Sequence, residues 1–426
     1  MKVLVVGGGG REHAIVQALN RSPSVSEVLC APGNAGIAED ARIVEAGAED
    51  VPAIVEEART EAAGLVVVGP EAPLVSGLVD ELESGGIPAF GPTAAAAKLE
   101  GSKAFAKEMM AEAGVPTAGY AVVRNSEEAL GRIAETEFPA VLKADGLAAG
   151  KGVIICENEE DARDAVNVFF GERRFGQTEV VIEEFLDGEE LSLLALCDGE
   201  NVVPLAPAQD YKRIFDGDEG PNTGGMGSYS PVPGVDPSRV EELADAVHRS
   251  VIDLMASRGT PFRGVLYAGL MMTSAGPKVL EFNTRFGDPE TQAVLPRLRS
   301  DLAELCLASR EPGGLAGMSA DFADDWAVTL VLASAGYPES ASKGDVIRGL
   351  GDAAALDGIA VTHAGTARDA DGNVVTAGGR VINVTALGPG PAEARDLAYE
   401  AAAMIDFEGM QLRTDIARRA TERVPG

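Results

Sequence analysis

The sequence has no long apolar run, few cysteines and few lysines, and each shortage narrows what the protein can be. No stretch of about 18 consecutive apolar residues occurs, so we expect no membrane-spanning helix and no membrane partner. The apolar run before the first glycines covers only Val3 to Val6, which is too short for the core of a signal peptide. The 4 cysteines form no C-x-x-C pair and stand beside no histidine cluster, which favours buried thiols in a reducing cytoplasm. They are Cys30, Cys156, Cys197 and Cys306.

Positive charge is scarce as well. Lysine and arginine number 35 against 67 acidic residues, which gives a formal net charge of -32 and a pI near 4.4. A field of that sign repels phosphate backbones at long range, so we expect no nucleic-acid partner. We hypothesise a high-salt cytoplasm, because salt screens the self-repulsion of an acidic surface. Only 9 residues are lysines, so a lysine inside a glycine-rich motif is a candidate for function.

The length of 426 residues exceeds what a single core supports and predicts several domains. The first hundred residues alternate short apolar runs with helical patterns, which is typical of a parallel sheet covered by helices. The runs are 3–6, 27–30, 65–69 and 87–91. Each run is followed by a glycine-containing turn, and the carboxyl ends of parallel strands share one edge, so we expect a binding surface there.

The pattern changes after position 101. We expect a helix over 102–114 and another over about 237–257, a glycine- and proline-rich loop over 216–234, and a closing helix near 391–405. The expected strands are 141–145, 152–156, 179–185, 191–197, 265–272 and 278–283, with several more after Trp326.

Four glycines, Gly7 to Gly10, follow the first apolar run. A dinucleotide fold requires G-x-G-x-x-G and an acidic residue about 20 positions further on. Neither register fits, because the third glycine position falls on Glu12 or His13, and the second run ends in LCAPGN without an acid. A site for a small phosphate ester at a helix N-terminus and a purely structural turn remain as interpretations.

The segment VLKADGLAAGKGV places Lys143 and Lys151 on either side of a glycine- and alanine-rich loop. Two ammonium groups beside such a loop can close over a triphosphate while backbone N–H groups donate hydrogen bonds to it. The spacing is not that of a P-loop. The alternative is a surface hairpin with lysines placed by chance.

The segment KVLEFNTRFGDPETQ carries the strongest local signal. Side chains at i, i+2 and i+4 of a strand share one face, so we expect Glu281, Asn283 and Arg285 to point together. A carboxylate and an amide oxygen are hard ligands that suit Mg2+, and an arginine beside them can clamp a phosphoryl group or a carboxylate. The segment therefore predicts a metal site for Mg2+ or Mn2+ at Glu281 and Asn283.

Two further segments contribute candidate ligand contacts. VVIEEFLDGEE predicts a slot for adenine and ribose, although acidic residues after a strand are often simply solvated. Its candidate residues are Glu183, Glu184, Phe185 and Glu190. In QDYKRIFDGDEGPNTGGMGSYSP, Asp210, Lys212 and Arg213 precede a glycine-rich loop that can approach a ligand closely, the alternative being a long surface loop.

Taken in order from Met1 to about Ala420, these strings resemble the phosphoribosylamine–glycine ligase family, also called glycinamide ribonucleotide synthetases, of the ATP-grasp superfamily. The resemblance implies ligation of glycine to 5-phosphoribosylamine with ATP and Mg2+, through a glycyl phosphate, in de novo purine synthesis. It is carried by GGGGREHA, APGNAG, VVGPEAPLVSGLVD, FGPTAAAAKLEGSKAFAK, VLKADGLAAGKGV, VIEEFLDGEE, QDYKRIFDGDEGPNTGGMGSYSP, GVLYAGLM, EFNTRFGDPETQ, KGDVI, HAGT and GGRVINVTALG.

The resemblance also implies a mixed α/β and α+β multidomain fold. A Rossmann-like N-terminal domain over 1–101 is followed by an ATP-grasp domain over 102–322, whose lid covers about 120–190, and by a small C-terminal α/β domain over 323–426. We expect a monomer, without a covalent nucleophile, because an acyl phosphate already supplies a good leaving group.

Carried over by position, the resemblance assigns roles to the residues above. The ATP phosphates are met by Lys103, Lys143 and Lys151, and the adenine and ribose by Glu183, Phe185 and Glu190. Glu184 and Lys212 are further expected contacts of ATP. Glycine and the amine are met by Asp210, Arg285, Asp288 and Glu290, and the 5-phosphate by Gly8, Gly9, Gly10 and Arg11. Arg285 and Lys151 are the expected catalytic residues, and Glu281 and Asn283 the metal ligands.

Some residues depart from this scheme or add little to it. Thr284 and Tyr211 differ from the family pattern, but alternation places both away from the metal face. His13 is a possible substrate contact, whereas we expect His248 and His363 to be structural. The competing functions are another ATP-grasp ligase or carboxylase, an oxidoreductase, which the failed glycine fingerprint disfavours, and a nucleotide sensor, which needs no metal face.

Overall fold

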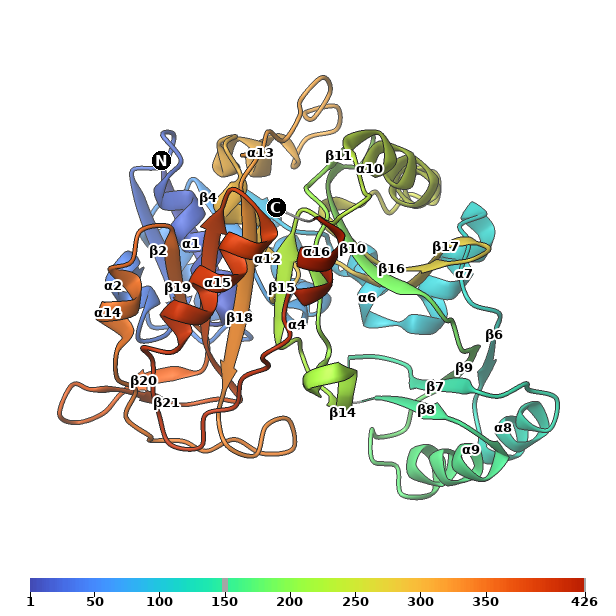
Figure 1. Cartoon of the computed structure of the whole chain (residues 1–426). Helices are drawn as coiled ribbons and strands as arrows, with labels where there is room; N and C mark the ends of the chain where they lie inside the picture. The colour runs from blue at the N-terminus through green and yellow to red at the C-terminus, as the bar shows by residue number, and fades with distance from the viewer. Residues whose placement is uncertain (148–151, 425–426) are drawn as a thin grey trace.

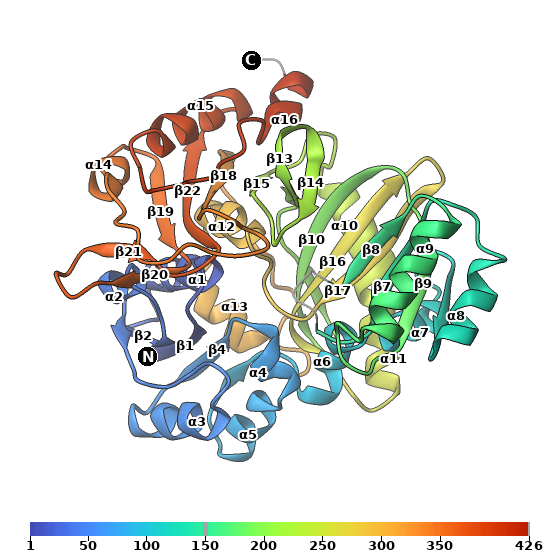
Figure 2. The same ribbon diagram turned by 90° about the horizontal axis from the view of Figure 1, so that it is seen from below.

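The computed structural model describes residues 1–147 and 152–424, and Figure 1 shows the course of the chain. Within these ranges the strands form four sheets of four or five strands and two small two-stranded ribbons. Seen from below, the N-terminal and C-terminal sheets lie on one side of the molecule and two antiparallel sheets lie on the other (Figure 2). None of the described helices is long and apolar enough to cross a membrane.

The N-terminal sheet is parallel, as the alternating pattern predicts, with the strand order β3-β2-β1-β4-β5. Its central strands are buried almost throughout because helices cover both faces. The strands are β1 (Lys2–Gly7), β2 (Glu27–Pro32), β3 (Arg42–Ile43), β4 (Leu65–Val68) and β5 (Ala89–Phe90), and the helices are α1 (Gly10–Asn20), α2 (Ile37–Asp40), α3 (Val51–Thr60), α4 (Glu71–Val75) and α5 (Leu78–Ser84). The glycine-containing turns follow β1, β2, β4 and β5, which confirms that they share one edge.

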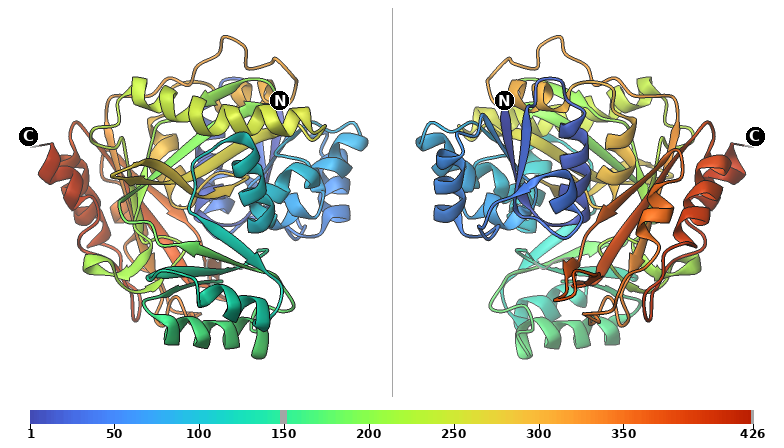
Figure 3. Two further views of the ribbon diagram at one scale, coloured as in Figure 1. Left: turned by 90° about the vertical axis from the view of Figure 1, so that its right-hand side faces the viewer. Right: turned by 90° about the vertical axis from the view of Figure 1, so that its left-hand side faces the viewer.

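The second sheet is small and antiparallel, with the order β6-β9-β7-β8, and it occupies the region expected for the lid. It lies at the bottom of the view in Figure 3, with two helices on its outer face. Both helices begin at an asparagine cap, because Asn125 and Asn158 accept the N–H groups of Glu128 and Asp161 at 2.9 and 3.0 Å. The elements are β6 (Tyr120–Val123), β7 (Ala140–Ala144), β8 (Val153–Cys156), β9 (Val180–Glu184), α8 (Ser126–Ile133) and α9 (Glu159–Val166).

The third sheet is antiparallel, has the order β11-β10-β16-β17 and packs against helices. Its strands are β10 (Glu189–Asp198), β11 (Val202–Pro204), β16 (Arg263–Thr273) and β17 (Gly276–Asn283). The neighbouring helices are α6 (Ala94–Gly101), α7 (Lys103–Ala113), α10 (Pro237–Ala244) and α11 (Ser250–Ser257). The strands and helices predicted between 102 and 283 are therefore confirmed. The loop predicted over 216–234 is wrong in part, because this segment contains two short strands, Glu219–Asn222 and Gly227–Ser230.

The fourth sheet has the order β12-β15-β18-β22-β19 and joins strands from both sides of the expected boundary at 322/323. The predicted domain limits thus stay a prediction. The elements are β12 (Gln209–Asp210), β15 (Gly227–Ser230), β18 (Trp326–Ala333), β19 (Ile359–His363), β22 (Arg380–Gly388), α12 (Glu290–Val294), α13 (Leu302–Ala308), α14 (Leu350–Ala354) and α15 (Pro391–Ala402). The ribbons are β13 (Arg213–Phe215) with β14 (Glu219–Asn222), and β20 (Thr366–Arg368) with β21 (Val374–Thr376).

The C-terminal part packs closely on the third sheet. One apolar core contains Tyr211 and Leu266 together with Leu330 and Phe407, so these regions share a single interior. The expected closing helix is α15, and a further short helix, α16 (Arg418–Arg423), follows that the sequence did not predict. The cysteines are free and buried, which confirms the interpretation of their spacing.

Candidate active site

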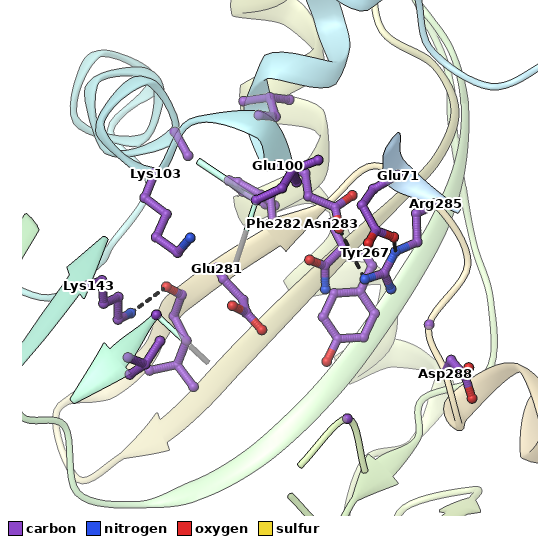
Figure 4. A pocket seen from close by; sticks show the side chains of 18 of the residues that line it. Glu71, Glu100, Lys103, Lys143, Tyr267, Glu281, Phe282, Asn283, Arg285 and Asp288 are labelled. Carbon is purple, nitrogen blue, oxygen red and sulfur yellow. Dashed lines mark hydrogen bonds and ion pairs between the residues drawn. The ribbon is translucent and has the colours of Figure 1, made fainter. Parts of the chain in front are cut away.

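A cavity of about 380 Å3 opens where the four sheets meet. Its polar side chains come from distant parts of the chain and face one another in Figure 4. The predicted residues that line it are Arg11, Lys103, Lys143, Glu183, Asp210, Glu281, Asn283, Arg285, Asp288 and Glu290. The sequence analysis missed Glu71, Glu100, Lys107, Tyr267 and Arg380, which also line it.

One end of the cavity is a cluster of lysines around a carboxylate. Lys107 and Lys143 both donate to Oε2 of Glu183, at 2.9 and 3.1 Å, and Lys107 also donates to Oγ1 of Thr117 at 2.7 Å. Oε1 of Glu183 is buried and has no hydrogen-bond partner within residues 1–147 and 152–424. The signal for Lys107 was its spacing, because residues four apart on a helix share a face and Lys103 stands one turn earlier.

Lys103 lies at the same end of the cavity as Lys143 (Figure 4) and donates to the carbonyl of Gly146 at 2.9 Å. Burial lowers the pKa of Lys103, and the carboxylates of Glu281 and Asp145 oppose that shift. Burial likewise lowers the pKa of Lys107, against the attraction of Glu183. Lys151, the other lysine expected here, lies outside the described residues.

Glu281 and Asn283 lie two positions apart on β17 and both line the cavity, as alternation predicts. Removal from bulk water would raise the pKa of Glu281, but the ammonium groups of Lys212, Lys143 and Lys103 hold it below its usual value. Among the described residues no group of three or more His, Cys, Asp or Glu side chains gathers around a metal position. A cation at Glu281 and Asn283 therefore needs further ligands, such as phosphate oxygens or water.

Arg285 reaches the cavity by a different route from the one expected. β17 ends at Asn283, so Arg285 belongs to the following loop, and the prediction that a strand carries it is wrong. Its Nε lies 3.3 Å from Oε2 of Glu71, and its Nη2 lies 3.0 Å from Oε1 of Glu100. Burial alone would lower the pKa of Arg285, but these two carboxylates raise it above its usual value.

Three more carboxylates line the side of the cavity near β12 and α12. Asp288 pairs with Arg380 at 2.8 Å and accepts from Gln292 at 2.7 Å. Glu290 accepts from the hydroxyl of Ser192 at 3.1 Å. Oδ1 of Asp210 is buried and finds no partner in the described part of the chain, and burial raises the pKa of Asp210 well above its usual value.

In the glycine turn after β1, a side chain of the following helix already accepts a backbone N–H group. The Gly9 N–H donates to Oε2 of Glu12 at 2.6 Å, and Glu12 also pairs with Arg11. A Cβ at Gly8 would stand 2.4 Å from the Gly33 carbonyl oxygen, so backbone packing already requires a glycine there. A structural turn thus explains part of this motif, and the role of Gly8, Gly9 and Gly10 toward a phosphate stays a prediction.

The remaining predicted contacts lie beside the cavity rather than on its surface. Lys212 is 2.8 Å from Oε2 of Glu190 and 4.0 Å from Oε1 of Glu281, so it lies close to one of the two metal-binding candidates. Glu184 pairs with Lys278, and the Phe185 side chain is 40% exposed. Of the described residues that line the cavity, none is Glu184, Phe185, Glu190 or Lys212.

The histidines lie apart from this chemistry. His13 pairs with Asp40 at 2.9 Å and accepts the N–H of His363 at 2.8 Å, so it joins the N-terminal and C-terminal sheets. It is absent from the described cavity lining. Burial lowers the pKa of His248 and of His363 to about 4, which supports the structural role predicted for both.

Family models match most of the chain. The N domain of phosphoribosylglycinamide synthetase matches residues 1–100, the ATP-grasp (A) domain matches 101–291, and the C domain matches 327–419. Relatives named phosphoribosylamine–glycine ligase occur in Streptomyces coelicolor, 53% identical over 423 residues, and in Rhizobium meliloti, 49% identical over 424 residues. Each alignment covers 99% of this chain and 99% of the relative.

Solved structures agree with these matches. The phosphoribosylamine–glycine ligase of Thermotoga maritima is 35% identical with a TM-score of 0.84, and the match covers 97% of this chain and 100% of that one. The biotin carboxylase domain of Hydrogenobacter thermophilus 2-oxoglutarate carboxylase, solved with MgADP, shares the fold at a TM-score of 0.71 and 19% identity, over 96% and 91% of the chains. The chain therefore belongs to the phosphoribosylamine–glycine ligase family, whose members are ATP-grasp enzymes of purine biosynthesis.

Proposed function

We propose that this chain joins glycine to 5-phosphoribosylamine through a glycyl phosphate, with release of ADP and phosphate. The observation that carries the proposal is the order of charges along the cavity. Lysines stand at one end, Glu281 and Asn283 stand in the middle, and Arg285 lies at the other end (Figure 4). This order matches a nucleotide tail, a bridging cation and a carboxylate substrate placed in line.

ATP would lie between the lid sheet and the third sheet. Lys103 and Lys143 offer ammonium groups to its phosphates, and Lys212 supports the same region through Glu190 and Glu281. Oε1 of Glu183 has no partner among the described residues, and it is an acceptor that the amino group of adenine can satisfy. Apolar walls for the base come from Met110, Val153, Leu280 and Phe282.

The donor set at β17 fits Mg2+ or Mn2+ only when a phosphate completes it. Glu281 keeps 40% of its side chain exposed and remains ionised under the influence of Lys212, so its oxygens are available to a cation. Asn283 supplies a neutral oxygen two residues further along the strand. When bound there, the cation would neutralise charge on the phosphate oxygens.

Arg285 would hold the carboxylate of glycine opposite the terminal phosphate. One carboxylate oxygen of glycine attacks the γ-phosphorus, the bond to ADP breaks, and glycyl phosphate forms. Asp210 and Glu290 lie on the same side of the cavity and offer acceptors for the ammonium group of glycine. The arrangement requires positioning and charge neutralisation, and no side chain becomes covalently modified.

The second step brings in 5-phosphoribosylamine. Its amine attacks the carbonyl carbon of glycyl phosphate, phosphate leaves, and the surplus proton of the nitrogen is released as the amide forms. Arg11 and Arg380 line the side of the cavity nearest the N-terminal and C-terminal sheets, so they are the candidate contacts for the sugar phosphate. We expect the glycine- and alanine-rich loop after Lys143, residues 145–152, to close over the intermediate and exclude water. Residues 148–151 lie outside the described part of the chain.

Phosphate release tests this proposal. With ATP and Mg2+, release should require glycine and 5-phosphoribosylamine together, and the product should be glycinamide ribonucleotide. Release with bicarbonate in place of glycine would favour the carboxylase alternative instead. We also propose that the protein is cytoplasmic and monomeric. Light scattering of the purified chain tests the monomeric state directly.

A further inference from the structure

Glu100 contacts three consecutive residues at and just beyond the end of β17. Its Oε1 forms an ion pair with Nη2 of Arg285 at 3.0 Å. The same oxygen lies 3.1 Å from the end of the Asn283 amide, and it accepts a hydrogen bond there when the amide nitrogen is the atom that faces Glu100. Its Oε2 accepts from the backbone N–H of Thr284 at 2.7 Å and from the Thr284 hydroxyl at 3.1 Å. One carboxylate on α6 therefore holds the whole segment 283–285, which contains two of the proposed functional residues.

The position of this carboxylate is unfavourable for the helix that carries it. Glu100 is the next-to-last residue of α6, where the helix dipole disfavours negative charge, and only 9% of it is exposed. A buried carboxylate persists only when donors satisfy it, and Glu100 has a donor on every side. The Glu100 carboxylate therefore stabilises the segment that it binds and does not stabilise α6.

The contact with Asn283 decides which atom of that amide is available. A carboxylate only accepts, so the amide nitrogen of Asn283 must face Glu100, and the same nitrogen also donates to the Phe282 carbonyl at 3.3 Å. The amide oxygen of Asn283 then points away from Glu100, and Asn283 itself lines the cavity. A hard cation binds an amide through this oxygen alone.

The contact with Arg285 fixes the plane of the guanidinium group. Glu100 binds Nη2, Glu71 binds Nε at 3.3 Å, and the Phe286 carbonyl accepts from Nη1 at 3.1 Å. Figure 4 shows Glu71, Glu100 and Asn283 gathered beside Arg285. Glu71 touches Arg285 but makes no hydrogen bond to Asn283 among the described contacts, so the two glutamates differ in one respect that can be tested.

We propose that Glu100 is a positioning residue that sets both the exposed atom of Asn283 and the plane of Arg285. The proposal rests on the metal site of the proposed function. Glu100 acts before any substrate arrives, because its contacts with Arg285 and Thr284 are already made in the free protein and its carboxylate already faces the Asn283 amide. Glu100 would thereby link the end of α6 to the cation site and to Arg285, which holds the carboxylate of glycine.

Binding of Mn2+ to the full-length protein in the presence of ADP, followed by electron paramagnetic resonance, tests the proposal without turnover. The wild type should bind Mn2+ in a nucleotide-dependent manner. Glu100→Gln should weaken that binding by about 10-fold or more, because the glutamine amide must turn one N–H toward groups that are themselves donors. Glu71→Gln is the matched control, which should keep wild-type Mn2+ affinity while raising KM for glycine.

Thr284 provides a second test that leaves the buried charge in place. Thr284→Val removes only the hydroxyl donor and should weaken Mn2+ binding in the same direction, whereas Thr284→Ser should restore it. Unchanged Mn2+ affinity in Glu100→Gln and Thr284→Val would overturn the positioning role, as would an equal loss in Glu71→Gln. A wild type that binds no Mn2+ with ADP would instead overturn the metal site itself, and this inference with it.

Discussion

The guanidinium group of Arg413 lies over the ring of Tyr211, with 4.8 Å between the guanidinium carbon and the ring centroid. Arg413 is 1% exposed and also binds Asp218 at 3.0 Å and Asp415 at 2.7 Å. Tyr211 stands next to Lys212, which faces Glu190 and Glu281. The C-terminal segment is thereby attached to the loop that supports the proposed nucleotide site.

Replacing Arg413 should therefore destabilise the protein. Arg413→Met removes the buried partner of Asp415 and one of the partners of Asp218, which also pairs with Arg419, so we expect a loss of about 1–3 kcal/mol in the free energy of unfolding, measured by urea denaturation. Arg418→Met is the control, because that side chain is 69% exposed and its pair with Glu422 contributes about 0.5 kcal/mol or less. Equal losses in the two variants would contradict the buried contact.

Glu281→Ala should lower kcat by about 100-fold or more, since it removes the charged ligand of the proposed cation site. The measurement is steady-state phosphate release at saturating ATP. Glu241→Gln, at an exposed position on α10, serves as the control for a lost surface charge. Activity of Glu281→Ala close to that of the wild type would remove the metal assignment.

Asp198 should make stability depend on pH in the acidic range. Its carboxylate accepts N–H groups from Glu200, Asn201 and Leu315 at 2.8, 2.6 and 2.8 Å, and although burial opposes the shift, these bonds lower its pKa below the ordinary 3.8. A depressed folded-state pKa contributes stability that is complete above the unfolded-state pKa and is lost as the pH falls through the folded-state value.

The comparison for this prediction is wild type against Asp198→Asn. At pH 6 the wild type should be more stable by about 1–3 kcal/mol, and the gap should narrow as the pH falls below about 4. Urea denaturation at several pH values provides the data. A gap that widens on acidification would have the wrong sign for a carboxylate with a lowered pKa.

Salt should stabilise the protein if its acidic surface is adapted to a high-salt cytoplasm. With a net charge of -32, self-repulsion is large in dilute buffer and is screened as ionic strength rises. We expect the melting temperature and the activity to be higher in about 2 M KCl than in about 0.1 M KCl. Equal values at the two concentrations would refute the hypothesis of a high-salt cytoplasm.

Local patterns in the sequence predicted those parts of the site that depend on neighbours in the chain. Glu281 and Asn283 share a strand, so alternation alone placed them together. Lys143 was predicted as a site residue from its place in a strand before a glycine-rich loop. The N-terminal parallel sheet follows from its repeated alternation of apolar runs and helices.

Other parts depend on contacts between distant residues, which no local pattern contains. Arg285 lies beyond the end of β17 and is held by Glu71 and Glu100, which come from α4 and α6. Arg380 reaches Asp288 across 92 positions of the chain. The glycine turn was misleading in part. The close approach of Gly8 to the Gly33 backbone requires a glycine at that position, whether or not an anion binds there.

A structure with a non-hydrolysable ATP analogue, Mg2+ and glycine tests the central claim most directly. The account predicts that the triphosphate lies between Lys143 and Glu281, with the cation on Glu281 and Asn283 and the glycine carboxylate at Arg285. A triphosphate bound anywhere else, or a cation that contacts neither Glu281 nor Asn283, would contradict it.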